Sequence, residues 1–215
     1  FGQQISGAGD LVKVNANNTL TLSATNTYTG DTTISAGTLK LTGNLNSATD
    51  LVIDTGATLD LQAALTAATL TLNGTINNTA GTSSLTISGT SNLGANVTTS
   101  GTQTYTGAVT LSAATVTLTT TDSNITFNGT INSDGGTARA LTIDLNGAAT
   151  ARVIIAVIAS PTVGSQLPPP DHADFKAQRK AAKARSACTM DAPSIGGLQS
   201  FAVVDCGFND DLVVS

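Results

Sequence analysis

The sequence contains no tryptophan and no glutamate, and only 11% of its 215 residues are charged. All 14 acidic residues are aspartates. Because Glu favours helices whereas Asp and Asn favour turns, this bias argues against a helical protein. Residues 1–150 contain 36 threonines, and residues 151–215 contain only Thr162 and Thr189. Since β-branched threonine suits a pleated, half-buried surface, the first 150 residues are predicted to be all-β.

Basic residues and long hydrophobic runs are scarce as well. Residues 1–150 hold three basic residues and carry a net charge of −5, so nucleic acid is not an expected partner. No run of about 18 or more apolar residues occurs, so no membrane-spanning helix is expected. The apolar run at residues 153–159 predicts a short buried strand instead. The chain begins at Phe1 without an initiator Met or a signal peptide, and we expect a fragment or processed product of a longer protein.

Residue types that carry catalysis or bind metals are also few. The single histidine, His172, cannot complete a Ser-His-Asp triad or a zinc site. The densest aspartates of the first 150 residues are Asp50, Asp54 and Asp60, and no Lys or Arg accompanies them. We interpret them as a solvated acidic face and expect no catalytic residue, cofactor or metal ion. A polysaccharide-acting β-helix enzyme that uses Asp54 or Asp60 is an alternative hypothesis.

Parts of the sequence recur. Asn73-Gly74-Thr75-Ile76-Asn77 returns letter for letter at residues 128–132, an offset of 55 residues. Thr27-Tyr28-Thr29-Gly30 returns at residues 104–107. Self-similarity of this kind is typical of stacked repeats. We interpret the pentapeptide as a turn that returns because coils return, with an offset of about two coils or a little more.

Short segments throughout residues 1–150 alternate polar and apolar side chains. Alternation buries Leu, Ile or Val on one face and presents Thr or Asp on the other. Examples are residues 19–22, 38–41, 58–61, 69–72 and 115–118. Gly, Asn, Asp or Ser fills nearly every gap between them and supplies turn geometry. Strands this short form no stable isolated hairpin, which leaves a sandwich or barrel, or a solenoid of stacked coils.

Three observations favour the solenoid. The repeats are similar in sequence, which a sandwich does not require. The apolar residues are small aliphatics with almost no aromatics, as a narrow coil interior demands. Thr and Asn in equivalent turns would form ladders of hydrogen bonds between coils. With about 20–25 residues per coil, residues 1–150 are predicted to form six or seven coils.

Residues 7–39 carry a family resemblance. Gly7-Ala8-Gly9-Asp10-Leu11, Thr19-Leu20-Thr21-Leu22-Ser23 and the run from Asn26 to Leu39 resemble the β-strand repeat of large Gram-negative surface exoproteins. That repeat is found in autotransporter passengers and in filamentous haemagglutinin-like adhesins exported by two-partner secretion. The resemblance implies a right-handed parallel β-helix at the cell surface or in the medium. The rest of residues 1–150 resembles the family through period and composition.

The C-terminal part follows other rules. Residues 151–170 are predicted to contain a final strand and a Pro-rich linker. Residues 171–215 are predicted to contain a short helix at 173–185, which Asp171 would cap, followed by a loop between the only two cysteines.

Cys188 and Cys206 fit neither a CxxC nor a Cys/His metal pattern. In an exported protein an isolated pair is expected to form one disulfide, which stabilises a loop of this size by about 3 kcal/mol. Two unpaired thiols are the alternative. Some high-molecular-weight two-partner adhesins end in a disulfide loop held by an outer-membrane transporter, and the resemblance in placement implies such a partner. The other interpretation is a cap that covers the end of the β-helix.

Asparagine sequons of the form Asn-x-Thr are frequent, and chance supplies most of them in a chain this rich in Asn and Thr. Some high-molecular-weight adhesins carry sugars at such sequons, so the resemblance implies candidate glycosylation sites. They are Asn17, Asn73, Asn77, Asn96, Asn124 and Asn128.

The sequence as a whole predicts the C-terminal part of a non-enzymatic, adhesin-like exoprotein at the surface of a Gram-negative bacterium. Residues 1–150 would form its β-helical stalk, and shallow polar contacts would bind glycans or proteins of host or neighbouring cells. An autotransporter passenger is the alternative, and it requires a further C-terminal membrane domain for which residues 151–215 are too few.

Overall fold

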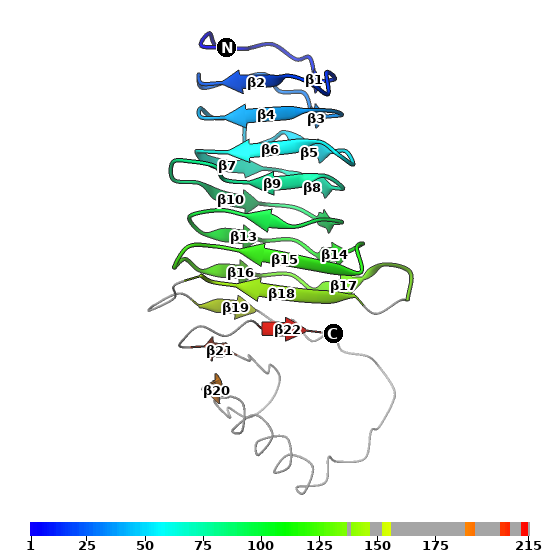
Figure 1. Ribbon diagram of the computed structural model, residues 1–215, viewed down its shortest axis with the longest axis vertical. Helices are drawn as coiled ribbons and strands as arrows, with labels where there is room; N and C mark the ends of the chain where they lie inside the picture. Colours follow the sequence, from blue (N-terminus) through cyan, green and yellow to red (C-terminus); the bar gives the residue numbers. More distant parts are fainter. Residues whose placement is uncertain (137–138, 147–151, 156–187, 192–202, 207–211, 215) are drawn as a thin grey trace, which may run out of the picture.

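The computed structural model describes residues 1–136, 139–146, 152–155, 188–191, 203–206 and 212–214. Its strands stack one above another from the N-terminal end onward, so the chain climbs along one long axis (Figure 1). Three sheets, which we name A, B and C, form the sides of this stack. Each pass of the chain through the three sides is one coil.

Sheet A contains seven parallel strands. They are β1 (Leu11–Lys13), β3 (Thr32–Ile34), β5 (Asp50–Ile53), β8 (Thr69–Leu72), β11 (Ser91–Leu93), β14 (Val109–Leu111) and β17 (Ile131–Ser133). Sheet B contains seven parallel strands and one antiparallel strand at its end. They are β2 (Thr19–Leu22), β4 (Thr38–Leu41), β6 (Thr58–Leu61), β9 (Thr75–Asn77), β12 (Val97–Thr98), β15 (Thr115–Thr119), β18 (Ala140–Asp144) and, antiparallel, β22 (Leu212–Val214).

Sheet C begins two coils later. Its parallel strands are β7 (Ala64–Ala67), β10 (Ser84–Ile87), β13 (Gln103–Tyr105), β16 (Ile125–Phe127) and β19 (Val153–Ile155). Two antiparallel strands follow at its end, β21 (Val203–Cys206) and β20 (Cys188–Asp191). A short 3₁₀ turn, η1 (Asp134–Gly136), lies between β17 and β18.

The register of sheet A sets the length of a coil. Six steps of parallel pairing carry Leu11 to Ile131. These residues are 120 positions apart, so a coil averages 20 residues. The described chain is therefore an all-β parallel solenoid of about six turns, as the sequence predicts, and the sandwich alternative is wrong. The right-handed sense that the resemblance implies stays a prediction.

Inward-facing aliphatic residues form the core. Leu39, Leu59, Ile76, Val97 and Leu118 follow one another in register on sheet B, and each is fully buried. Burying such a side chain stabilises the fold by about 1.5–3 kcal/mol. Their neighbours along each strand face outward, which confirms the predicted alternation. We call each such set of residues, aligned in register across successive coils, a column.

The repeated pentapeptide does not mark equivalent positions of the coil. Residues 73–77 turn the chain from β8 of sheet A into β9 of sheet B, whereas residues 128–132 turn it from β16 of sheet C into β17 of sheet A. The two copies are eight strands apart, or two coils and two further sides. The interpretation that the turn recurs because whole coils recur is therefore wrong. The unit that is repeated in the sequence is one side of the coil, which consists of a strand and the corner that follows it.

At Gly107 and Gly129, in the corner from sheet C to sheet A, the approach of the preceding coil leaves no room for a Cβ, although Thr49 and Ala68 occupy the same column in earlier coils. An added Cβ on Gly129 would lie 2.3 Å from the carbonyl oxygen of Gly107, and one on Gly107 would lie 2.3 Å from that of Gly89. No left-handed φ is present at Gly107 or Gly129. The spacing of the coils, about 4.8 Å, leaves room here for backbone alone.

The remaining predictions fall on the C-terminal part. Strand β19 pairs in parallel with β16, so the stack extends at least to Ile155. Strands β20 and β21 place Cys188 opposite Cys206 in register. The side chains of both cysteines lie outside what the structure describes, so the disulfide stays a prediction. The predicted helix at 173–185, the Pro-rich linker and His172 also lie outside the described residues.

Candidate interaction surface

The outer face of sheet B presents a column of polar side chains, six threonines and one asparagine. Its members lie in register, and each is exposed or half-buried. They are Thr19, Thr38, Thr58, Thr75, Asn96, Thr117 and Thr142. Sheet C presents a second column, made of Thr66, Thr86, Thr104 and Thr126. The residues of these columns face outward and alternate along each strand with the apolar residues that fill the core.

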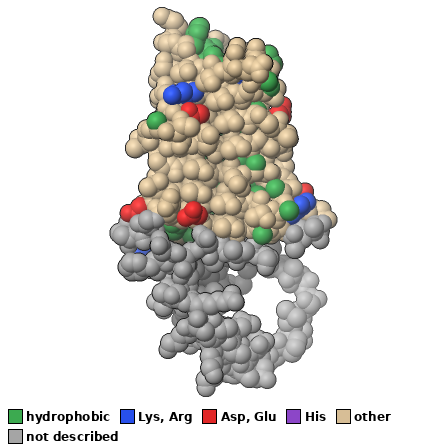
Figure 2. Space-filling view, viewed as in Figure 1, with side chains coloured by type: hydrophobic (Ala, Val, Ile, Leu, Met, Phe, Trp, Pro, Cys, Tyr) green, Lys and Arg blue, Asp and Glu red, His purple; other side chains and the backbone are tan. Residues whose placement is uncertain are grey.

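Charged side chains are sparse and scattered on this surface. Figure 2 shows one face on which uncharged polar side chains and backbone dominate, with a few isolated acidic and basic groups. Within the described ranges, no three His, Cys, Asp or Glu side chains gather as metal ligands would. None of the described residues belong to a helix with the length and hydropathy needed to cross a membrane.

A column of aspartates lies where the chain enters sheet A. The Asp10 carboxylate accepts a hydrogen bond from the backbone N–H of Asp31 at 2.9 Å, and the Asp31 carboxylate accepts one from that of Asp50 at 3.4 Å. The Asp50 carboxylate in turn accepts one from the Thr69 hydroxyl at 2.8 Å. Each carboxylate therefore bonds to the next coil. This column was not predicted from the sequence, although an Asp before or at a strand start recurs with 19- to 21-residue spacing.

The interpretation of Asp60 as part of a solvated acidic face is wrong, because only 6% of its surface is exposed. Its carboxylate accepts hydrogen bonds from the Thr79 N–H at 3.0 Å, the Thr79 hydroxyl at 2.7 Å and the Gln62 amide at 2.8 Å. Asp54 lies beyond the end of β5, whereas Asp60 lies in β6 of another sheet. Gly56 (φ +82°) turns the chain between them, so the two carboxylates face different sides of the rod.

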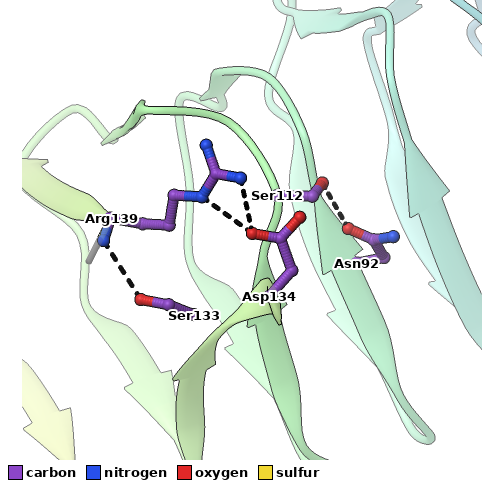
Figure 3. A network of polar contacts seen from close by, with 5 residues as sticks. All are labelled: Asn92, Ser112, Ser133, Asp134 and Arg139. Atoms are coloured by element: carbon purple, nitrogen blue, oxygen red, sulfur yellow. Dashed lines mark hydrogen bonds and ion pairs between the residues drawn. The ribbon is translucent and has the colours of Figure 1, made fainter. Parts of the chain in front are cut away.

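Figure 3 shows a polar network at the corner from sheet A to sheet B. The Nε and Nη2 atoms of Arg139 both donate to Asp134 Oδ1 at 2.7 Å, and the Arg139 N–H donates to the Ser133 hydroxyl at 3.1 Å. On two earlier coils, the Ser112 hydroxyl donates to Asn92 Oδ1 at 2.5 Å. An ion pair this exposed contributes about 0–1 kcal/mol. The ion pair joins Asp134, at the start of η1, to Arg139, which directly precedes β18.

Both tyrosines of the chain point into the solenoid. The Tyr105 hydroxyl donates to Gln103 Oε1 at 3.0 Å, and the Tyr105 ring stacks on Phe127 with centroids 5.2 Å apart. Burial raises the pKa of the Tyr105 phenol well above its usual range. Burial also raises the pKa of Tyr28, although its hydrogen bond with Thr32 acts in the opposite direction. Neither phenol is available for surface contact.

The six candidate glycosylation sites differ in exposure. The asparagines that are exposed are Asn17, Asn73, Asn96 and Asn128. Asn77 and Asn124 are half-buried, and Asn124 Oδ1 already accepts the Arg152 N–H at 2.8 Å. Whether any of the six carries a sugar stays a prediction.

Comparison with protein families adds one match. Residues 17–41 fit the model of the passenger-associated-transport-repeat family. The chain carries a passenger-associated transport repeat. No match was found in comparisons with the curated proteins or with the solved structures. The resemblance to autotransporter passengers is therefore confirmed at the level of this repeat.

The transport repeat spans one coil of the solenoid and the first strand of the next coil. Residues 17–41 run from the start of β2 through β3 to the end of β4. Within it, Thr19 lies against Thr38 in register, 19 residues further on. A repeat of this family is typical of secreted passengers, which indicates a surface or extracellular location. Its apolar residues build the core, so the transport repeat describes the rod and identifies no ligand.

Proposed function

We propose that this chain is part of a passenger at a Gram-negative cell surface, in which the solenoid is a non-enzymatic adhesive stalk. The observation that supports the proposal is that the transport repeat spans one complete coil and the strand that stacks on its start. Stacked coils make a rod whose length grows by about 4.8 Å per coil. Such a rod suits the presentation of other parts of the protein away from the cell.

The adhesive contact would come from the threonine columns of sheets B and C. They offer closely spaced hydroxyl groups on flat faces without dense charge. Glycans or proteins on host or neighbouring cells would meet them through many weak polar contacts. A repeat protein gains binding through such an extended surface rather than through one deep pocket.

Adhesion is tested with beads coated with the full chain and applied to cultured cells and to glycan arrays. The matched variant replaces Thr66, Thr86, Thr104 and Thr126 by Lys, which places charge on sheet C without touching the core. We expect the wild-type chain to bind and the variant to bind less, with unchanged circular dichroism. Equal binding by both, or by beads coated with an unrelated β-solenoid, contradicts adhesion by sheet C.

The export route is a separate part of the proposal. An outer-membrane transporter would hold the C-terminal part, with Cys188 and Cys206 closing its loop. Deleting residues 187–215 should then release the protein into the culture supernatant, and unchanged surface retention contradicts the anchor. A gene for a separate transporter beside the coding region favours two-partner secretion, and its absence favours a self-exporting passenger.

A further inference from the structure

The two copies of the pentapeptide Asn-Gly-Thr-Ile-Asn share all five residues and lie at different places in the coil. Each begins with an Asn-Gly step, at Asn73 and at Asn128. We propose that Asn128 deamidates spontaneously in the folded protein and that its twin Asn73 is protected. A third such step, at Asn146, is followed by a glycine outside the described residues.

The reaction needs only the chain and water. The backbone nitrogen of the glycine loses its proton to solvent base and attacks Cγ of the asparagine side chain. The bond from Cγ to the side-chain nitrogen breaks, ammonia leaves, and a five-membered succinimide remains. Water opens this ring at either carbonyl and produces aspartate or isoaspartate. One water is consumed and one ammonia released. Glycine favours the attack because it has no Cβ to crowd the ring.

The corner at Asn73 holds the attacking nitrogen in place. The Gly74 N–H donates to the Ile53 carbonyl at 3.0 Å, and the same carbonyl accepts the Asn73 N–H at 2.8 Å. The two glycines are crowded alike, since an added Cβ would lie 2.3 Å from the Ala57 oxygen at Gly74 and 2.3 Å from the Gly107 oxygen at Gly129. Gly74 is buried, however, and its N–H is bonded, whereas Gly129 is half-buried. The peptide is therefore fixed to the preceding coil. Its nitrogen cannot rotate toward Cγ unless the corner opens.

The corner at Asn128 leaves that nitrogen without a partner. The Asn128 N–H donates to the Tyr105 carbonyl at 2.9 Å. The Gly129 N–H donates to no acceptor in the described part of the chain. The Asn128 side chain is exposed and Gly129 is half-buried. No hydrogen bond has to break before Gly129 nitrogen attacks, and water reaches the ring that forms.

The test follows both sites in one sample. The full chain is incubated at 37 °C in mildly alkaline buffer and digested with chymotrypsin, which cleaves after Leu72 and after Phe127. Peptide mass spectrometry then measures the replacement of NH₂ by OH at each asparagine. We expect Asn128 to convert at least about tenfold faster than Asn73, which corresponds to about 1.4 kcal/mol. The difference arises because a hydrogen bond must break and the corner must open at Asn73.

The denatured chain is the internal control. In denaturant the two sites have no tertiary structure and share the four residues that follow each asparagine, so their rates should agree within about twofold although Leu72 precedes one and Phe127 the other. Equal rates in the native chain, or faster conversion at Asn73, overturn the proposal. Asn128→Ser should lower the fast ammonia release from the native chain by one equivalent per chain, whereas Asn73→Ser should leave it unchanged. The opposite result also overturns the proposal. Both positions are exposed, so neither variant disturbs the core.

Discussion

Replacing Gly107 by alanine tests whether the spacing of the coils is what requires glycine at the corner from sheet C to sheet A. Gly107 has no left-handed φ, so alanine is allowed by its local backbone. An added Cβ would lie 2.3 Å from the Gly89 oxygen and 2.5 Å from the Gly89 carbonyl carbon. Gly107 itself donates its N–H to that oxygen at 3.2 Å. The obstruction is therefore backbone of the preceding coil, which cannot rotate away as a side chain would.

The size of the effect follows from these distances. Carbon atoms in contact lie about 3.5–4.0 Å apart, so the two coils would have to separate by roughly 1 Å at this corner. Overpacking of this kind typically destabilises by about 1–3 kcal/mol. We expect the upper end, about 3 kcal/mol, because the hydrogen-bonded strands on both sides of the corner resist separation of the two coils. For 150–250 residues this lowers the melting temperature by about 6–12 °C.

The assay compares thermal unfolding of Gly107→Ala with that of Gly9→Ala. Gly9 lies at the N-terminal end of the same column, and an added Cβ there meets nothing within 4 Å. Its replacement should change stability by no more than about 0.5 kcal/mol. If the two variants melt at the same temperature, the argument from coil spacing is refuted.

Three further predictions follow from the register and the buried groups. Deleting residues 38–57 removes one coil, because Thr38 and Thr58 stack in register. The shortened chain should still unfold cooperatively on heating, and small-angle scattering should show a shorter rod. Deleting residues 38–47 should abolish that transition, since strands would stack out of register. Asp60→Ala should lower the free energy of unfolding by about 1.5–3 kcal/mol in denaturant titrations, because three donors lose a charged acceptor. The contribution of the two tyrosines to stability should be constant up to about pH 10 and then fall by about 1.4 kcal/mol per pH unit for each tyrosine that stays protonated in the folded chain. The unfolded chain releases the phenolic protons of Tyr28 and Tyr105 there, whereas the folded chain retains them because their pKa values are raised.

Each of these has an outcome that contradicts it. The register argument fails if the two deletions behave alike. The role of Asp60 fails if its replacement leaves the denaturation midpoint unchanged. The two tyrosines are the only ones in the chain, so tyrosinate absorbance reports them alone. A tyrosinate signal that rises near pH 10 before circular dichroism is lost would mean that the phenols titrate in the folded state.

The fold was predictable because its main determinant is local. The alternation in residues 38–41 and 58–61 identifies which side chains face inward without knowledge of any partner strand. The scarcity of aromatic residues then indicates a narrow interior. The few large rings that do occur inside, such as Tyr105 and Phe127, sit in one column and stack on each other. That arrangement depends on which coils are neighbours, and no local pattern contains it.

The polar contacts were harder to predict, because they also depend on which coils are neighbours. Aspartate is a residue type that is usually exposed to solvent. Asp60 is buried because Thr79, from the next coil, donates a hydrogen bond to its carboxylate. The column of Asp10, Asp31 and Asp50 depends on which strand starts lie above one another. The spacing of these aspartates, about one coil, contains that signal, whereas the 55-residue offset of the pentapeptide is not a whole number of coils.

The sequence by itself determined that residues 1–150 form short strands with one apolar face, and that such strands stack as coils. A period-two pattern and turn residues are sufficient for this, because each acts within a few residues. Only the tertiary structure decided which corners are equivalent. The same five residues, Asn-Gly-Thr-Ile-Asn, bend the chain from sheet A to B in one copy and from C to A in the other. Their chemistry is the same, but the neighbouring coil decides whether the glycine N–H is bonded at Gly74 or left without an acceptor at Gly129 in the described structure.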